Sequence, residues 1–207
     1  MDRDIFQQRY LEHIERKKLL SQRQQGIRPG KNVPALALDA LASRHSQRTF
    51  SDVALQEHEK RMLYEAVQFA PSSCNRQAIC IQVAEQPERR QVLEQCIVGG
   101  RNWIGSAPTA LLLFADMRAY KNPAERDFMP WLDAAFVAAN VCFAALALGL
   151  GACYVNPNIR ERDRALFDSV FNDADLLFCG AVAVGNYQAA DEPAPKRALE
   201  RIFYPGG

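Results

Sequence analysis

The sequence lacks an excess of charge of either sign. Its 207 residues include 25 Lys and Arg against 24 Asp and Glu, which gives a formal net charge of +1. A chain this balanced has no global field that attracts nucleic acid or an anionic membrane surface, so we expect neither as a partner. Any anion that the protein binds must be held by a local group of basic residues.

Two kinds of chemical motif are also missing. No two of the six cysteines form a C-x-x-C pair, so the sequence has neither a zinc knuckle nor a thioredoxin-type redox motif. His13, His45 and His58 show no catalytic-triad or metal-ligand spacing, so we expect no metal site. The cysteines are Cys74, Cys80, Cys96, Cys142, Cys153 and Cys179.

A secretory leader is not apparent. Charged residues interrupt the apolar ones near the start of the sequence, which leaves no continuous apolar segment of the kind found in signal peptides. Together with the scattered cysteines, most of them among apolar neighbours, this favours a reducing, cytoplasmic location.

One long apolar run covers residues 131–150. Much of it is alanine, and it contains Asp133 and Asn140. An unpaired Asp in hydrocarbon costs roughly 2.5–3.5 kcal/mol on insertion scales. A helix that is apolar on every side is typical of the centre of a soluble protein, so we favour a core helix over a membrane span.

The length fits one globular domain with an N-terminal addition. Phe6, Tyr10 and Ile14 recur at helical spacing among charged residues, which predicts an amphipathic helix over residues 1–20. Residues 21–34 are polar and rich in Gly and Pro, as linkers are. We therefore predict a helical extension and linker over residues 1–34 and a compact domain over residues 35–207.

Within the compact domain, helices and strands intermingle. Apolar spacing and breaker residues predict helices over residues 35–42, 56–69, 87–97 and 130–148. Alternating or continuous apolar runs predict strands over residues 79–84, 109–115, 152–155 and 177–184. This pattern indicates an α+β domain whose sheet is covered by helices.

Three separated segments are candidates for ligand binding. In residues 44–50, Arg44 and Arg48 lie four apart with Ser46 between them, and guanidinium groups match phosphate oxygens with paired donors. Residues 70–77 place small polar side chains after Pro71, which suits the edge of a flat polar heterocycle. Residues 193–200 contain adjacent cations after two prolines. Alone, the first segment reads more readily as a solvated basic turn, the second equally as a capped turn, and the third as an exposed basic tail.

The order and spacing of these segments resemble the nitroreductase family. The resemblance consists of Arg-x-Ser-x-Arg-x-Phe, then Ala-Pro-Ser-Ser-x-Asn-x-Gln about 25 residues later, Gly-Leu-Gly after a long alanine-rich helix, and Lys-Arg-x-Leu-Glu near the end. It covers about residues 36–203, and the Ala-Pro-Ser-Ser motif is its most specific part.

Membership implies an FMN-dependent homodimer with two equivalent sites at the subunit interface. It implies a central, mostly antiparallel sheet, with the long apolar helix in the dimer core. By resemblance, the FMN phosphate and ribityl end would be held by Arg44, His45 and Ser46, with Lys196 and Arg197 completing the phosphate clamp. Arg48 would contact the pyrimidine edge of the flavin ring. The ring would also be lined by residues of the other subunit, namely Pro71, Ser72, Ser73 and Asn75. Hydride passes between nicotinamide and flavin directly, so no catalytic side chain is assigned.

Two positions depart from the family pattern. Gln77 is followed by Ala78 and Ile79, where the family usually has Pro and an aromatic residue. The strand after Gly-Leu-Gly commonly delivers a backbone N–H to the flavin, and here Asn156 precedes Pro157, which has no N–H. The contact is lost if the donor falls at Pro157 and survives if it falls at Asn156, which is therefore the candidate cofactor-binding residue here.

The resulting expectation is an FMN-dependent oxidoreductase that carries hydride from NAD(P)H to a small electron-poor acceptor such as a nitroaromatic or a quinone. The alternatives are a redox-silent flavin-binding protein, a specialised family member (dehalogenase, flavin-cleaving enzyme or azoline oxidase) and a non-flavin helical interaction protein. Residues 103–126 are either part of a substrate cover or ordinary surface.

Overall fold

The computed structural model describes residues 39–171, 175–198 and 201–202. The chain divides into two units, residues 1–42 and 43–207, and the second contains the sheet. The helix predicted over residues 1–20 and the linker over residues 21–34 lie outside the described residues, so the predicted boundary after residue 34 stays a prediction. Of the helix predicted over residues 35–42, the described part is helical.

A four-stranded sheet forms the centre of the second unit, in the order β1-β2-β4-β3. The strands are β1 (Ile79–Ala84), β2 (Thr109–Asp116), β3 (Gly151–Val155) and β4 (Leu176–Gly185). All three neighbouring pairs are antiparallel, which confirms the predicted sheet type. The two central strands, β2 and β4, are almost entirely buried, as strands covered on both faces are.

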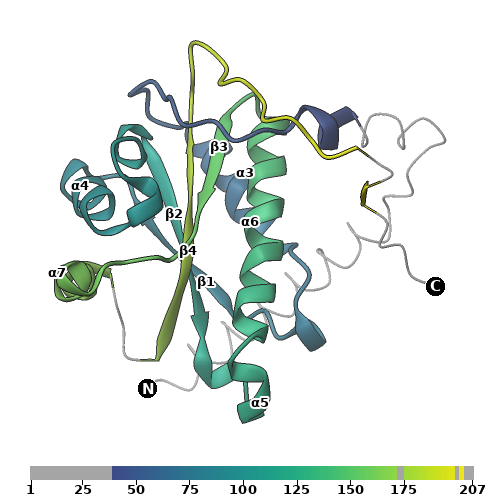
Figure 1. The fold of residues 1–207 in the computed structure, drawn as a ribbon, viewed down its shortest axis with the longest axis vertical. Helices are drawn as coiled ribbons and strands as arrows, with labels where there is room; N and C mark the ends of the chain where they lie inside the picture. The colour runs from purple at the N-terminus through teal and green to yellow at the C-terminus, as the bar shows by residue number, and fades with distance from the viewer. Residues whose placement is uncertain (1–38, 172–174, 199–200, 203–207) are drawn as a thin grey trace, which may run out of the picture. The chain divides into compact units, whose positions relative to one another are not determined.

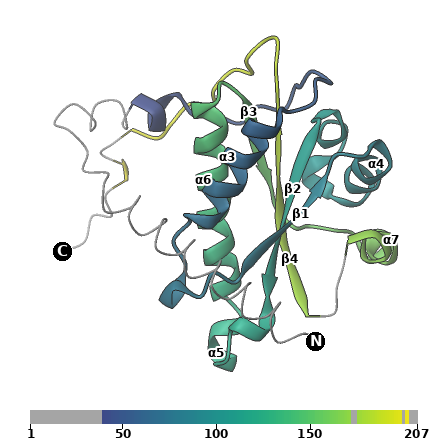
Figure 2. The same ribbon diagram turned by 180° about the vertical axis from the view of Figure 1, so that it is seen from behind.

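Helices cover both faces of this sheet (Figures 1 and 2). On one face lie α3 (Glu57–Gln68) and the long α6 (Met129–Ala147), and on the other lie α4 (Pro87–Cys96) and α7 (Glu161–Phe171). The predicted helices and strands of this unit are found to within one or two residues. Two further helices, α7 and the short α5 (Pro123–Arg126), were not predicted from the sequence.

Successive side chains of β2 point to opposite faces of the sheet and so contribute to the hydrophobic core on each face. Leu111 and Leu113 pack with α3 and α6, whereas Leu112 and Phe114 pack with α4 and α7. In the second core the Phe114 and Phe178 rings lie 5.4 Å apart, within the range of favourable aromatic pairs. The sheet is thus held rigidly from both sides, and its edge strand β3 is positioned accurately.

The long apolar helix α6 buries only one side within this chain. Its buried side packs on the sheet and on α3, where the Asn140 side chain donates to the Ala66 carbonyl (3.2 Å). By length and composition α6 is the one helix in the described part of the chain that could cross a membrane, with 44% of its most apolar window buried. A helix that packs on a sheet in a protein core can have the same length and apolar composition, and α6 packs on this sheet.

Candidate functional site

The basic segment at residues 44–50 lies along the edge strand β3. The Gln47 backbone N–H donates to the Ala152 carbonyl (3.0 Å) at the start of that strand. The approach is so close that a Cβ on Gly151 would lie 2.5 Å from Cγ of Gln47 and 2.9 Å from its Cβ. Only glycine at position 151 therefore allows the segment to take this place.

Gln47 fastens the basic segment to the chain that follows the sheet. Its side-chain amide donates to the carbonyls of Thr49 (2.9 Å) and Ala189 (3.2 Å), and its side-chain oxygen accepts from the Asp191 N–H (2.9 Å). The Asp191 carboxylate in turn accepts from the Arg48 N–H and from the Thr49 hydroxyl (3.1 Å). This Gln47–Asp191 clasp fixes the backbone between the two arginines, and Gln47 itself is only 2% exposed.

Positive charge gathers where the segment meets β3 and α6. Burial raises the pKa of the Cys142 thiol to about 11, although nearby Arg44 acts to lower it. Burial likewise raises the pKa of Cys153, against the lowering effects of Arg48, a hydrogen bond from Ser46, and Arg44. Arg44 thus lies near both thiols, and Ser46 and Arg48 lie near Cys153, where Asp191 adds a negative charge. That these residues bind a phosphate stays a prediction.

A cavity of about 310 Å³ opens beside Arg44. It is lined by α6 residues between Ala135 and Phe143 and by Tyr154 of β3. His45 lines a neighbouring smaller pocket with Arg44 and Tyr187, and its Nδ1 lies 3.0 Å from the Ser43 carbonyl. The Arg48 guanidinium lies over the Trp103 ring, 5.8 Å from its centroid, which places one end of the 103–126 segment beside the site.

The loop at residues 71–77 has an unusual backbone. Cys74, Asn75 and Gln77 have φ values of 52°, 54° and 52°, the left-handed region that residues other than glycine rarely adopt. The Gln77 N–H donates to the Ser72 hydroxyl (3.0 Å), and the Gln77 amide donates to the Asn75 side chain (3.2 Å). Such a backbone persists only where surrounding contacts hold it, and it is often found at functional sites.

Within one chain this loop and Arg44 lie at different levels of α6. The Ser73 N–H donates to Asp133 (2.8 Å), near the start of the helix, whereas Arg44 lines the cavity beside Cys142. Nine residues separate the two helical positions, about 14 Å at 1.5 Å per residue. The structure of a single chain therefore keeps the two predicted halves of the site apart.

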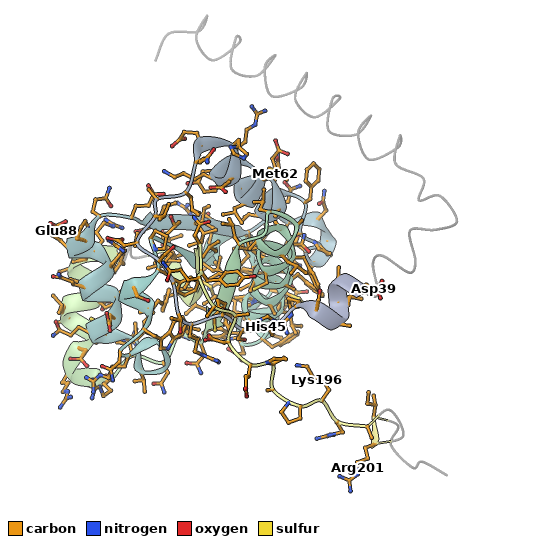
Figure 3. The ribbon with its side chains drawn as sticks, turned by 90° about the horizontal axis from the view of Figure 1, so that it is seen from above. Asp39, His45, Met62, Glu88, Lys196 and Arg201 are labelled. Atoms are coloured by element: carbon orange, nitrogen blue, oxygen red, sulfur yellow. The ribbon has the colours of Figure 1, made fainter. Side chains whose placement is uncertain are left out.

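The remaining predicted residues are not brought to Arg44 by any described contact. Lys196 and Arg197 are exposed in an extended segment beyond Asp191, which Figure 3 shows leading away from the body of the domain. Asn156 is exposed directly after β3, and its side chain accepts from the Asn158 N–H (3.2 Å). Pro71 is exposed at the start of the left-handed loop. Their roles stay predictions.

A stripe of exposed apolar side chains runs along the outer side of α6. Trp131, Leu132 and Phe136 are 39%, 49% and 48% exposed, and the exposed Ala135 and Ala139 continue the stripe toward the cavity. The positions recur every three or four residues and so share one face. Adjoining exposed apolar side chains of this kind are typical of interaction surfaces.

Known proteins resemble the chain over most of the sheet-containing unit. The chain is 29% identical over 128 residues to the FMN reductase (NAD(P)H) of Bacillus subtilis (strain 168), covering 55% of this chain and 51% of that protein. The match thus spans about half the length of that relative. The FMN reductase (NADPH) of the same organism is 25% identical over 181 residues, covering 81% of this chain and 72% of that protein.

Solved structures agree with the fold. A nitroreductase-type protein of Desulfovibrio desulfuricans in complex with FMN has a TM-score of 0.70 at 26% identity, covering 82% of this chain and 96% of that chain. An FMN-dependent nitroreductase of Clostridium difficile R20291 has a TM-score of 0.69 at 21% identity, covering 81% and 98%. The family model described as Nitroreductase family matches residues 78–186, more than half of the sequence. The chain belongs to the nitroreductase family.

Proposed function

We propose that the protein is an FMN-dependent oxidoreductase that takes hydride from NADH or NADPH and reduces a small electron-poor acceptor. The observation that carries this proposal is the placement of the basic segment, with Arg44, Ser46 and Arg48, along the edge strand β3, on a backbone fixed by the Gln47–Asp191 clasp. Family membership and the flavin-reductase relatives support it. Bound FMN would supply the redox chemistry, by accepting hydride from the nicotinamide.

The phosphate of FMN would bind at Arg44, His45 and Ser46. A guanidinium and a hydroxyl offer several directed donors to phosphate oxygens, and a backbone already fixed by the clasp needs little reordering on binding. Lys196 and Arg197 begin five residues beyond Asp191. Five extended residues span up to about 17 Å, so this segment is long enough to bring both cations to the same phosphate.

The flavin ring would lie toward β3, with its pyrimidine edge against Arg48. A fixed positive charge there favours the reduced, anionic ring, and so makes hydride acceptance easier. Stacking of the Arg48 guanidinium on Trp103 (5.8 Å) restricts where that charge can move. The Asn156 backbone N–H, at the end of the same strand, would donate to the ring.

The site would be shared between two copies of the chain. If two α6 helices pack antiparallel through their apolar stripes about a two-fold axis, the start of one helix lies beside the end of the other. The loop of residues 71–75 from the partner would then reach the site that contains Arg44. Pro71, Ser72, Ser73 and Asn75 would line the ring from that side, and the stripe would lose its contact with water.

The test begins with cofactor binding. Purified protein should bind FMN, and anaerobic NADH or NADPH should bleach the bound flavin. Arg44→Ala should raise the Kd for FMN about 10- to 150-fold, because hydrogen bonds to charged groups contribute about 1.5–3 kcal/mol. Arg61→Ala is the matched control, since Arg61 is exposed on α3 and pairs with Glu65 on the same helix (3.3 Å).

Two results would contradict the proposal in different ways. Protein that neither contains nor binds FMN would exclude a flavoenzyme. Protein that binds FMN but is not bleached by either nucleotide would instead favour the redox-silent flavin-binding alternative, which Pro157 motivates because it cannot donate an N–H.

A further inference from the structure

A buried carboxyl group of α6 holds the left-handed loop in place. Asp133 is only 1% exposed and lies in an otherwise apolar stretch of the helix. One of its oxygens accepts from the Ser73 N–H (2.8 Å), and the other accepts from the Tyr120 hydroxyl (2.9 Å). Burying a carboxyl group is costly unless its oxygens have donors, and here each oxygen has one.

The second donor is itself fixed. Tyr120 is fully buried, and burial, with the hydrogen bond and charge of Asp133, raises the pKa of its phenol, which therefore keeps its proton at neutral pH. The phenol therefore serves as a permanent hydrogen-bond donor. The position of the Tyr120 hydroxyl orients the Asp133 carboxylate, and the carboxylate in turn positions the Ser73 backbone.

An ion pair fastens the far end of the same loop. The Arg76 guanidinium pairs with Glu125 of α5 (2.6 Å), donates to the Ser73 hydroxyl (3.2 Å) and lies over the Tyr120 ring (5.7 Å). The residues between these two attachments include Cys74 and Asn75, both in the left-handed region. The loop thus keeps an unfavourable backbone because both of its ends are held: Ser73 by Asp133 of α6, and Arg76 by Glu125 of α5.

We propose that Asp133 is a positioning residue of the flavin site, which sets the conformation of the loop of residues 72–75 through the Ser73 N–H without touching the cofactor. This inference rests on the proposed function, in which that loop lines the flavin ring. Asp133 would then determine how tightly FMN is held and how its ring is seated. The Tyr120 hydroxyl and the Arg76–Glu125 ion pair act as its supports.

The experiment compares two buried carboxyl groups in the full-length protein. Asp133→Ala leaves the Ser73 N–H and the Tyr120 hydroxyl without their acceptor, and should raise the Kd for FMN about tenfold or more and shift the absorption bands of bound flavin. Asp163→Ala is the control, because Asp163 lies on α7, across the sheet from α6, is 8% exposed and pairs with Arg160 just before that helix (3.1 Å). It should lower the unfolding temperature without changing the Kd or the flavin spectrum.

Conservative variants keep the inference testable if Asp133→Ala does not fold. Asp133→Asn retains one acceptor for the Ser73 N–H and should restore most of the affinity, whereas Tyr120→Phe should weaken binding by a smaller factor than Asp133→Ala. An Asp133 series that loses stability like Asp163→Ala while keeping the wild-type Kd and spectrum would overturn the positioning role alone. Failure of the wild-type protein to bind FMN would overturn the proposed function and this inference with it.

Discussion

The two halves of the proposed site can be separated by mutation, because Arg44 and Asn75 lie at different levels of α6 in one chain. Arg44→Ala would remove the proposed contact with the FMN phosphate. Asn75→Gly removes the loop side chain, and glycine adopts the φ of 54° at this position without strain. A homodimer of either variant carries the same defect in both of its sites, so each variant alone should have little activity.

A heterodimer of the two variants should recover activity. If the loop acts on the partner's site, one of the two sites combines both defects and the other combines neither, so turnover per dimer should be about half of the wild-type value. If the loop acts on its own chain's site, every site keeps one defect and nothing is recovered. The separation of about 14 Å along α6 makes the shared arrangement the expected one.

The assay uses two affinity tags, co-expression and sequential purification, followed by NAD(P)H-dependent reduction of a quinone. The reciprocal control pairs a wild-type chain with a chain that carries both substitutions. That heterodimer should be almost inactive under the shared arrangement, and about half active if each chain builds its own site. No recovery in the first heterodimer, together with half activity in the second, would refute the shared site.

Two further predictions concern the surroundings of Arg44. Gly151→Ala should raise the Kd for FMN and lower the unfolding temperature, because the new Cβ would lie 2.5 Å from Cγ of Gln47. Gly149→Ala is the control: its φ of +72° should cost roughly 1–2 kcal/mol of stability, but the new Cβ meets nothing within 4 Å, so the Kd should stay unchanged. Equal Kd values for the two variants in FMN titrations would speak against the close approach. Burial raises the pKa of Cys142 from 9.0 to about 11, so the unfolded thiol ionises first as the pH rises through this window, and the free energy of unfolding should fall. In urea titrations at pH 8 and pH 10.5 this fall should be smaller in Cys142→Ala, and an equal fall would contradict the assignment.

Much of the fold could be predicted because its elements have strong local signals. Pro87 opens α4 and the left-handed Gly149 follows α6, and the apolar runs of β2 and β4 are too short for helices. The helix α7 was missed because it buries few residues, among them Phe167 and Phe171, between charged neighbours. So few buried apolar residues give little helical periodicity in the sequence. The helix is stabilised mainly by packing on the core beside α4.

The site could be predicted only as separate segments. Arg44 and Arg48 stand out by charge, but the clasp that fixes them joins Gln47 to Asp191, 144 residues away, and no local pattern records such a pair. Asp133 was conspicuous as an acid in an apolar helix, while its donors come from segments far from it in the sequence. Whether Lys196 joins Arg44 depends on an exposed segment, and its role stays a prediction.

The contact between Gln47 and Asp191 also joins the segment before the first strand of the sheet to the segment after its last strand. A proteolytic cut near residue 190 would therefore remove the acceptor of the Arg48 N–H without cutting any of the four strands, so the backbone around Arg48 should become mobile while the sheet stays folded.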